Sequence, residues 1–209
     1  MTYEKCKEAG MVLIYGFPNE NSYHGLTHSL GWTHANDLIE WNFSFRMKIS
    51  PIHKFLKYSA VCRQIFFRSL HKILKKYIPK DINDFSNEMD PHYGKVLRDQ
   101  NYVRYKRGAE RIFIKIGEVI IWLRFSTFLW IGDFHHFEKI NDHTISELKK
   151  IARLSGYNSI RFALNQEIKL PQCMQEFKVF GSIASCVLYL DKQTIYPPFV
   201  FTPADFDTW

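Results

Sequence analysis

The sequence lacks the long hydrophobic segments that mark membrane-spanning and secreted proteins. None of its apolar runs reaches the length of about 18 residues that a membrane-spanning helix needs. Its start, MTYEKCKEAG, does not have the basic and then apolar order of a signal peptide. We therefore expect a cytoplasmic protein without a membrane span.

Cysteine is sparse, and metal-binding patterns are missing. The four cysteines show no paired short spacing of the zinc or redox kind, so we interpret them as reduced residues of the core. His24 and His28 would share one face of a helix, and His135, His136 and His143 lie close together in the sequence. Neither group has a third ligand at a recognised spacing. No metal site is therefore expected.

The signatures of several other functional classes are absent as well. The sequence has no Gly-x-Ser-x-Gly nucleophile elbow, no Walker phosphate-binding loop and no internal repeat. It does have the length and the apolar content of a folded protein. A chain of 209 residues with 46% hydrophobic content can bury the core of one or two small globular domains.

The net charge of +7 is concentrated in one segment. Residues 51–80 hold eight of the 28 Lys and Arg residues and none of the 21 Asp and Glu residues, so the rest of the chain is close to neutral. Apolar residues recur there at three- and four-residue steps, which predicts one amphipathic helix or two, entered at Pro51 and ended before Pro79. Such a helix either contacts an anionic membrane surface, here the inner membrane surface, or is a solvated helix packed by its other face. Nucleic acid is not an expected partner, because no aromatic stacking platform or reader motif accompanies the charge.

A strand, a turn and a helix are predicted near the start of the chain. Residues 11–14 (Met-Val-Leu-Ile) predict a buried strand, which Pro18 and Asn19 interrupt. Asn21 or Ser22 then caps a helix that ends at a Gly-Trp pair. A strand that leads into a helix N-terminus makes an anion site, because unpaired N–H groups and the positive end of the helix dipole face the ligand. The alternative is an ordinary strand-turn-helix unit without a ligand.

The second half of the sequence predicts a succession of strands and helices after an acidic connector, DINDFSNEMDP. Three strands rich in Ile, Val, Phe and Trp form a meander over residues 110–134. The elements expected after it are a helix capped by Asp142 or Thr144 and ended by Gly156, a strand over 158–164, a short helix over 171–177, a turn at Gly181, and strands over 183–190 and 195–201.

These patterns together resemble the GNAT superfamily of acyl-CoA N-acyltransferases. Residues 16–32, GFPNENSYHGLTHSLGW, resemble its acyl-CoA-binding end, and the order of elements after residue 110 is similar to the one that closes a GNAT domain. The segment YVRYK and the tail FTPADFDTW resemble the second half of tandem GNAT-like proteins of bacteria. The resemblance implies a mixed α/β fold, with a GNAT-like, largely antiparallel sheet flanked by helices.

The resemblance also divides the chain into three ranges. Residues 1–50 are expected to be the C-terminal part of a GNAT-like domain, residues 51–100 the basic helix with the acidic connector, and residues 101–209 a second GNAT-like half. The family grips the cofactor pyrophosphate with a loop of the type Arg/Gln-x-x-Gly-x-Gly/Ala upstream of the first strand. Only Thr2 to Gly10 precede that strand here. We therefore expect the N-terminal part with this loop to be missing, in a fragment or in a degenerate or partnered acyltransferase.

The activity implied by the resemblance is acyl transfer. Acetyl-CoA or another acyl-CoA is the expected cosubstrate, and the expected acceptor is a small-molecule or cell-envelope amine. We expect an N-acyltransferase of this kind, with an inactive chain as the alternative if the sequence is truncated before the pyrophosphate loop. The competing interpretation is a non-catalytic interaction module that binds a partner or an anionic surface.

Candidate site residues follow from what acyl transfer requires: a deprotonated amine, a stabilised oxyanion and a proton for the leaving thiolate. In the family the acid is often a tyrosine, whose position falls here near Leu26 or Thr27, and neither of these can act as that acid. Tyr23 lies one helical turn earlier and is therefore the candidate acid. Asp133 is the candidate base, with His135 beside it. Cofactor contacts are expected from Pro18, Asn19, Asn21 and Ser22, and substrate contacts from Tyr105, His135, Asp205 and Asp207. An ordinary structural role is the alternative for each of them.

Overall fold

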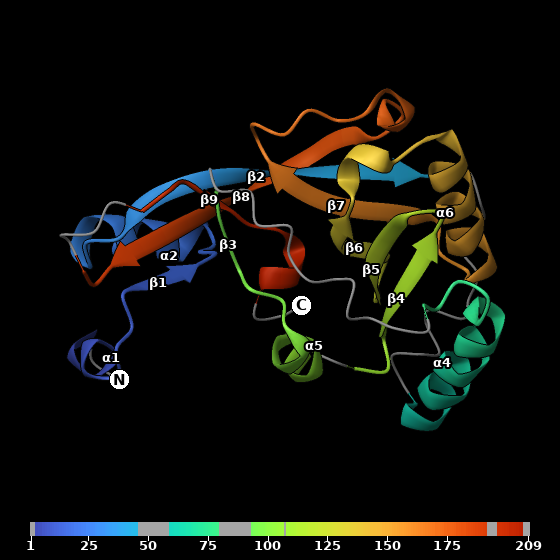
Figure 1. Cartoon of the computed structure of the whole chain (residues 1–209), viewed down its shortest axis with the longest axis horizontal. Coiled ribbons are helices and arrows are strands. Elements are labelled where there is room, and N and C mark those ends of the chain that lie inside the picture. Colours follow the sequence, from blue (N-terminus) through green and yellow to red (C-terminus); the bar gives the residue numbers. More distant parts are fainter. Residues whose placement is uncertain (1–2, 46–58, 80–92, 107, 192–195, 207–209) are drawn as a thin grey trace.

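Seven strands form the main sheet of the protein. They are β1 (Leu13–Gly16), β2 (Thr33–Ser44), β4 (Arg111–Ile116), β5 (Val119–Phe125), β6 (Leu129–His135), β7 (Ser159–Asn165) and β8 (Lys178–Tyr189). Their order across the sheet is β1-β8-β2-β7-β6-β5-β4 (Figure 1). This computed structural model describes residues 3–45, 59–79, 93–106, 108–191 and 196–206.

All neighbouring strands of this sheet are antiparallel except β6 and β7. That parallel pair shares only two register positions, Leu129 with Ile160 and Trp130 with Arg161, although each strand has seven residues. The two strands therefore diverge beyond Trp130. The expected mixed α/β fold with a largely antiparallel sheet is confirmed, as is the meander, which forms β4, β5 and β6.

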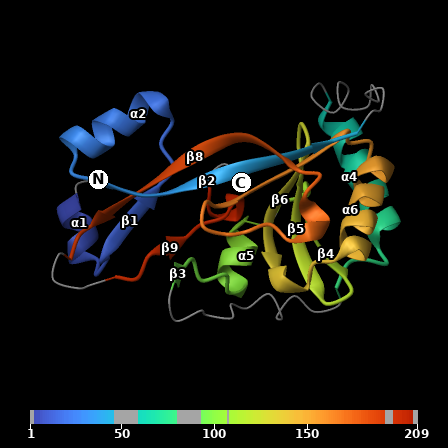
Figure 2. The same cartoon turned by 90° about the horizontal axis from the view of Figure 1, so that it is seen from above.

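Helices and short elements surround the sheet (Figures 1 and 2). They are α1 (Tyr3–Glu8), α2 (Glu20–His24), the π-helical turn η1 (Gly25–Ser29), α4 (Ala60–Leu74), α5 (Gln100–Lys106), α6 (Asp142–Leu154) and the 3-10 turns η3 (Phe137–Lys139), η4 (Gln172–Met174) and η5 (Pro203–Asp205). Two further strands, β3 (Gly94–Lys95) and β9 (Phe199–Val200), pair in parallel with each other.

Both faces of the meander are buried, which explains its almost unbroken apolar sequence. In β5, Ile121 and Leu123 pack in one hydrophobic cluster with α4 and α6, whereas Ile120 and Trp122 pack in another with Ala204 of η5. Figure 1 shows β4, β5 and β6 between α4 and α6 on one side and α5 with the C-terminal segment on the other. None of the helices within the described residues has the length and apolar character needed to cross a membrane.

The N-terminal elements form close to where the sequence places them, with two corrections. The strand expected at 11–14 lies at Leu13–Gly16 and is only half-buried, because β1 is an edge strand that pairs with β8 alone. The helix cap is Asn19 and not Asn21 or Ser22. Asn19 has the extended backbone of an N-cap (φ −79°, ψ 172°), and its side chain accepts a hydrogen bond from the Ser22 N–H at 3.0 Å.

Several details of the second half also differ from the prediction. The strand expected over 183–190 begins already at Lys178, and within the described part of the range 195–201 only Phe199–Val200 forms a strand. The cap of α6 is Asn141, whose extended backbone allows its side chain to accept from the Thr144 N–H, and not Asp142 or Thr144. Gly181 is not in a turn, because β8 continues through it and pairs it with Glu40 of β2. Gly156 does end α6, with a positive φ of 74°.

The sheet joins segments from both ends of the chain. The twelve-residue β2, which was not predicted, pairs with β7 on one side and β8 on the other. Strands from residues 1–50 and from residues 101–209 are thus hydrogen-bonded into one sheet.

The basic segment contains one described helix, α4. Ser59 caps it by accepting from the Cys62 N–H, and Phe67, Leu70 and Leu74 point into the core. The predicted start at Pro51 and the acidic connector lie outside the described residues.

The packing of α6 predicts a large difference between two leucines on the same helix. Leu148 is fully buried and Leu154 is 54% exposed. We expect Leu148→Ala to lower the free energy of unfolding by about 2 to 5 kcal/mol, because it leaves a cavity, and Leu154→Ala to change it by less than about 1 kcal/mol. Urea unfolding of both variants measures this. Equal losses would contradict the placement of α6 on the sheet.

Candidate functional site

A groove of about 870 Å³ opens beside the start of α2. Three segments line it: the turn that leads from β1 into α2, the first half of β2, and the middle of β8. The lining residues are Phe17, Pro18, Asn19, Glu20, Tyr23, His34, Asp37, Ser182, Ile183 and Ala184. The floor is rigid, since β2 and β8 pair directly here, with Asp37 opposite Ala184.

A β-bulge in β2 brings two polar side chains of the groove together. Residues three apart in a regular strand point to opposite faces, but the register shifts between His34 and Asn36. As a result His34 Nε2 lies 3.8 Å from Asp37 Oδ1. The buried Ser185 holds the bulge, because its hydroxyl donates to the Asn36 carbonyl at 2.7 Å and accepts from the Asn36 N–H at 3.1 Å.

The lining of the groove is acidic. Glu20 and Asp37 supply two carboxylates, and the Tyr23 ring packs edge-on to the His34 ring at a centroid distance of 5.9 Å. No Lys or Arg is among the described residues that line it. A cleft lined by charges of one sign concentrates ligands of the opposite sign. The groove is therefore suited to a cationic ligand.

Two N–H groups at the start of α2 have partners within the chain. The N–H groups of Ser22 and Tyr23 donate to the Asn19 carbonyl, at 3.1 and 2.9 Å, and the Ser22 N–H also donates to the Asn19 side chain. These two of the N–H groups expected to face an anion are thus used within the cap and first turn of the helix.

A buried ionic cluster forms a second polar centre. The guanidinium of Arg98 lies between two carboxylates, with Nη1 2.9 Å from Asp133 Oδ2 and Nη2 2.7 Å from Asp205 Oδ1. Its Nη2 also donates to the Thr202 hydroxyl at 3.0 Å. The Thr202 N–H donates to Asp205 Oδ2 at 2.9 Å, so that η5 begins in a capping box.

Burial perturbs the acidic groups of this cluster. It raises the pKa of Asp205 from its ordinary value of 3.8 to about 6, although Arg98 acts in the opposite direction. Burial also raises the pKa of Asp133, again against the effect of Arg98. For Arg98 burial favours the neutral form, but Asp133 and Asp205 outweigh it and raise the pKa of the guanidinium.

The cluster fixes the C-terminal segment, residues 199–206, across the diverging ends of β6 and β7. Arg98 links η5 to Asp133 of β6. Asn165, the last residue of β7, donates from Nδ2 to the Phe199 carbonyl and accepts from the Phe201 N–H. The Tyr102 hydroxyl of α5 donates to the Ala204 carbonyl. The gap between the two parallel strands is therefore occupied by the chain itself.

The structure divides the predicted site residues between these two centres. Pro18, Asn19 and Tyr23 line the groove, while Asn21 and Ser22 lie in the same turn but not in its lining. Asp133 and Asp205 meet at Arg98 and are not in the groove lining.

The remaining predicted residues stand apart from both centres. Tyr105 projects from α5 and is 77% exposed. The His135 ring packs against the His136 ring at the end of β6, with centroids 3.9 Å apart. Asp207 lies outside the described residues.

Several residues of both centres were not predicted. Glu20 directly follows the cap residue Asn19, so its place in the turn was readable once that cap was assigned. His34 and Asp37 depend on an unpredicted bulge. Arg98 was not predicted, because it lies 107 positions from its predicted partner Asp205 and no local spacing connects the two residues.

The raised pKa of Asp205 predicts a pH dependence of stability. Between about pH 4 and 6 the folded protein keeps a proton on Asp205 that the unfolded chain has released, so raising the pH lowers the free energy of unfolding, by at most ~3 kcal/mol. Asp205→Asn lacks this titration. Urea unfolding from pH 4 to 7 should therefore show wild type losing stability relative to the variant. Parallel profiles would contradict the burial of this carboxyl group.

Comparisons with known proteins identify no family. No protein-family model and no curated protein matches the chain. Among solved structures, a GCN5-related N-acetyltransferase from Kribbella flavida is similar with a TM-score of 0.47 and 9% identity, covering 90% of this chain and 45% of that one. Another, from Sphaerobacter thermophilus, has a TM-score of 0.44 and 8% identity, covering 90% and 62%. The chain thus spans less than two thirds of the length of each.

Proposed function

We propose that this chain is the acceptor-binding portion of an acyl-CoA-dependent N-acyltransferase, and that its groove receives a primary amine. The observation that supports this most directly is the acidic lining, with Glu20, Asp37 and no Lys or Arg among its described residues. An aliphatic amine is protonated in neutral water, as the pKa of lysine shows. Its ammonium group is attracted to the two carboxylates and is repelled by none of the lining side chains.

The same groove contains groups suited to the proton transfers. The ammonium must lose a proton before its nitrogen can attack, and His34, oriented by Asp37, is the proposed base. The nitrogen then bonds to the thioester carbonyl carbon and the carbon–sulfur bond breaks, and the proton that the acylated nitrogen releases replaces the one that the thiolate receives. Tyr23, packed against His34, is the proposed donor of a proton to the leaving thiolate.

The acyl-CoA itself is proposed to depend on a part of the protein outside this sequence. Its phosphates need cationic or N–H donors, but the groove lining is acidic and the nearby N–H groups of Ser22 and Tyr23 donate to Asn19. The family resemblance assigns the pyrophosphate to a Gly-rich loop. This chain does not contain that loop, and we therefore expect it to bind acyl-CoA only weakly by itself.

A non-catalytic interaction module is the second candidate function. It is favoured by the C-terminal segment, which is hydrogen-bonded across the diverging ends of β6 and β7. By the resemblance, a backbone N–H at such a splayed strand stabilises the oxyanion. Because the C-terminal segment occupies the space between β6 and β7, an oxyanion has no room there. This favours a structural role for residues 101–209.

The groove is tested by amine binding to the chain as it is. We expect calorimetry at low salt to detect spermidine or lysine methyl ester, but not their fully N-acetylated forms, which carry no ammonium group. Glu20→Gln and Asp37→Asn should each weaken binding by about tenfold, because a charge-assisted hydrogen bond contributes about 1.5 to 3 kcal/mol and the groove is partly solvated. The transfer of the acetyl group to these amines is then tested by measuring the release of free coenzyme A thiol from acetyl-CoA.

The control is Glu138→Gln, which removes an exposed carboxylate of η3 outside the groove lining and should leave amine binding unchanged. An equal loss in this control would show a general charge effect. Absence of amine binding would refute the acceptor site and favour the interaction module.

A further inference from the structure

The outward face of α4 carries a stripe of side chains that do not pack into the hydrophobic core. Phe67, Leu70 and Leu74 pack inward. Steps of three and four residues place a second set on one common face. This stripe consists of Val61, Ile65, Arg68, Lys72 and Lys76, the last in the turn after the helix.

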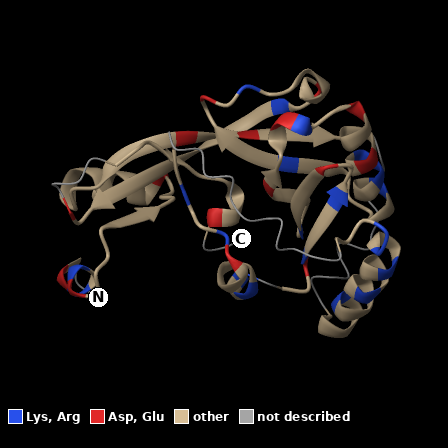
Figure 3. Cartoon of the chain, viewed as in Figure 1, with Lys and Arg blue, Asp and Glu red and all other residues tan. Residues whose placement is uncertain are grey.

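The stripe combines exposed apolar side chains with unbalanced positive charge. Val61 is 65% exposed and Ile65 is 58% exposed, one helical turn apart. Figure 3 shows Lys and Arg along α4 without an acidic residue, as the sequence of residues 51–80 requires. Within the described part of the chain, Arg68 and Lys72 form no ion pair.

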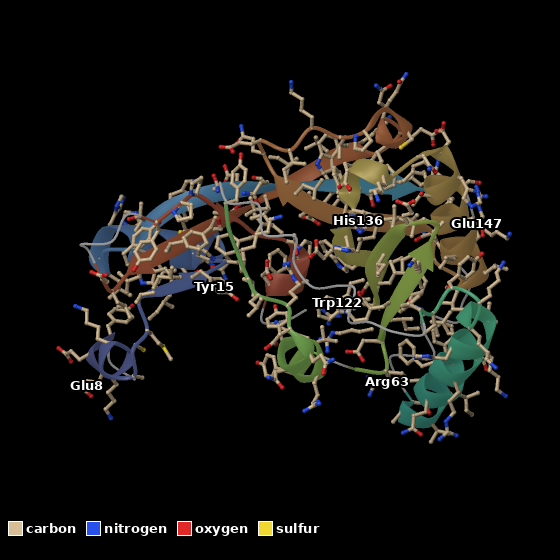
Figure 4. The ribbon with its side chains drawn as sticks, viewed as in Figure 1. Glu8, Tyr15, Arg63, Trp122, His136 and Glu147 are labelled. Atoms are coloured by element: carbon tan, nitrogen blue, oxygen red, sulfur yellow. The ribbon has the colours of Figure 1, made fainter. Side chains whose placement is uncertain are left out.

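Glu147 of the neighbouring helix α6 interacts electrostatically with Lys76, the last cation of the stripe, and has other partners as well. Glu147 of α6 accepts a hydrogen bond from the Tyr77 hydroxyl and pairs with Lys150 at 3.2 Å. Figure 4 shows Glu147 on α6 and Arg63 on α4, both at the end of the molecule remote from α2. The positive field of α4 therefore extends toward solvent.

Helix stability explains only part of this arrangement. Cations in the last turn interact favourably with the helix dipole, which accounts for Lys72 and its neighbours. Arg63 lies near the N-terminus, where a cation is unfavourable, and the dipole gives no reason for exposed Val61 and Ile65.

We propose that the outward face of α4 binds an anionic lipid surface, with Val61 and Ile65 in the interfacial layer and Arg68, Lys72 and Lys76 against lipid phosphates. An amphipathic helix binds such a surface through buried apolar area together with attraction of its cations to anionic headgroups. A lipid surface fits better than a nucleic acid. The stripe presents two β-branched side chains and no aromatic residue on which a base would stack.

Vesicle sedimentation tests the proposal on the full chain. Phosphatidylcholine vesicles with about 30% phosphatidylglycerol should bind it, and pure phosphatidylcholine vesicles should not. Binding should weaken steeply from about 0.1 to about 1 M NaCl, as the Debye length falls from about 10 to about 3 Å. Arg68→Gln/Lys72→Gln/Lys76→Gln should lower the partition coefficient about 100-fold, since each cation near the surface contributes about a fivefold factor.

Two matched variants distinguish binding through the outward face of α4 from binding through the net charge of the protein. Lys5→Gln/Lys7→Gln/Lys178→Gln removes the same charge from exposed positions of α1 and β8, and should lower the partition coefficient by less than about threefold. Val61→Gln/Ile65→Gln keeps all charges and should lower it by about tenfold, because it removes the apolar contact. Circular dichroism melting checks that each variant is folded.

Three outcomes would overturn the proposal. Vesicle binding that does not require phosphatidylglycerol would remove the role of the cations. An equal loss in the α1 and β8 control would show that only net charge matters. Binding to a DNA duplex in preference to the vesicles, unchanged by Val61→Gln/Ile65→Gln, would assign the face to nucleic acid.

Discussion

The pairing of β2 with both β7 and β8 is the interaction on which the rest of the structure depends. It connects the edge strand β1 and the groove to the meander and its core. The same strand positions the groove chemistry, because its bulge, pinned by Ser185, turns His34 and Asp37 to one side. This local irregularity, one of two in the ladder between β2 and β8, thus makes a structural strand part of the groove lining.

Charged side chains gather in three places among the described residues, and their role differs from one place to the next. Around Arg98 the charge is buried and internal, since one guanidinium satisfies two carboxylates and closes the C-terminal segment over the sheet. In the groove it is acidic and open to solvent, and on α4 it is basic and open to solvent. A buried ion pair is often no more stabilising than apolar residues of the same volume, whereas removal of one partner leaves an uncompensated buried charge. The two exposed surfaces have opposite signs, which directs an amine and an anionic surface to different parts of the protein.

The sequence allowed most elements to be predicted because their signals are local, and the fold class followed from the family resemblance. Nearly unbroken apolar runs mark β4 to β6, and apolar residues at three- and four-residue steps mark α6. By contrast, β2 mixes His34, Asn36 and Asp37 with apolar residues and has no clean period. The Arg98 cluster also escaped prediction, since its members come from segments distant in sequence and become neighbours only when the C-terminal segment folds back. Asp133 and Asp205 were singled out as acidic side chains, but their shared partner was not.

The position of β2 in the sheet has a consequence for how the chain folds. Asn36 of β2 and Ser185 of β8 are hydrogen-bonded although 149 positions separate them. β1 and β2 are synthesised before β7 and β8, so they lack their sheet partners until those later strands have been made. Contacts of such long range slow folding, and unpaired strand edges favour association with other chains in the meantime. The N-terminal strands are therefore the part of the nascent chain most in need of protection by a chaperone.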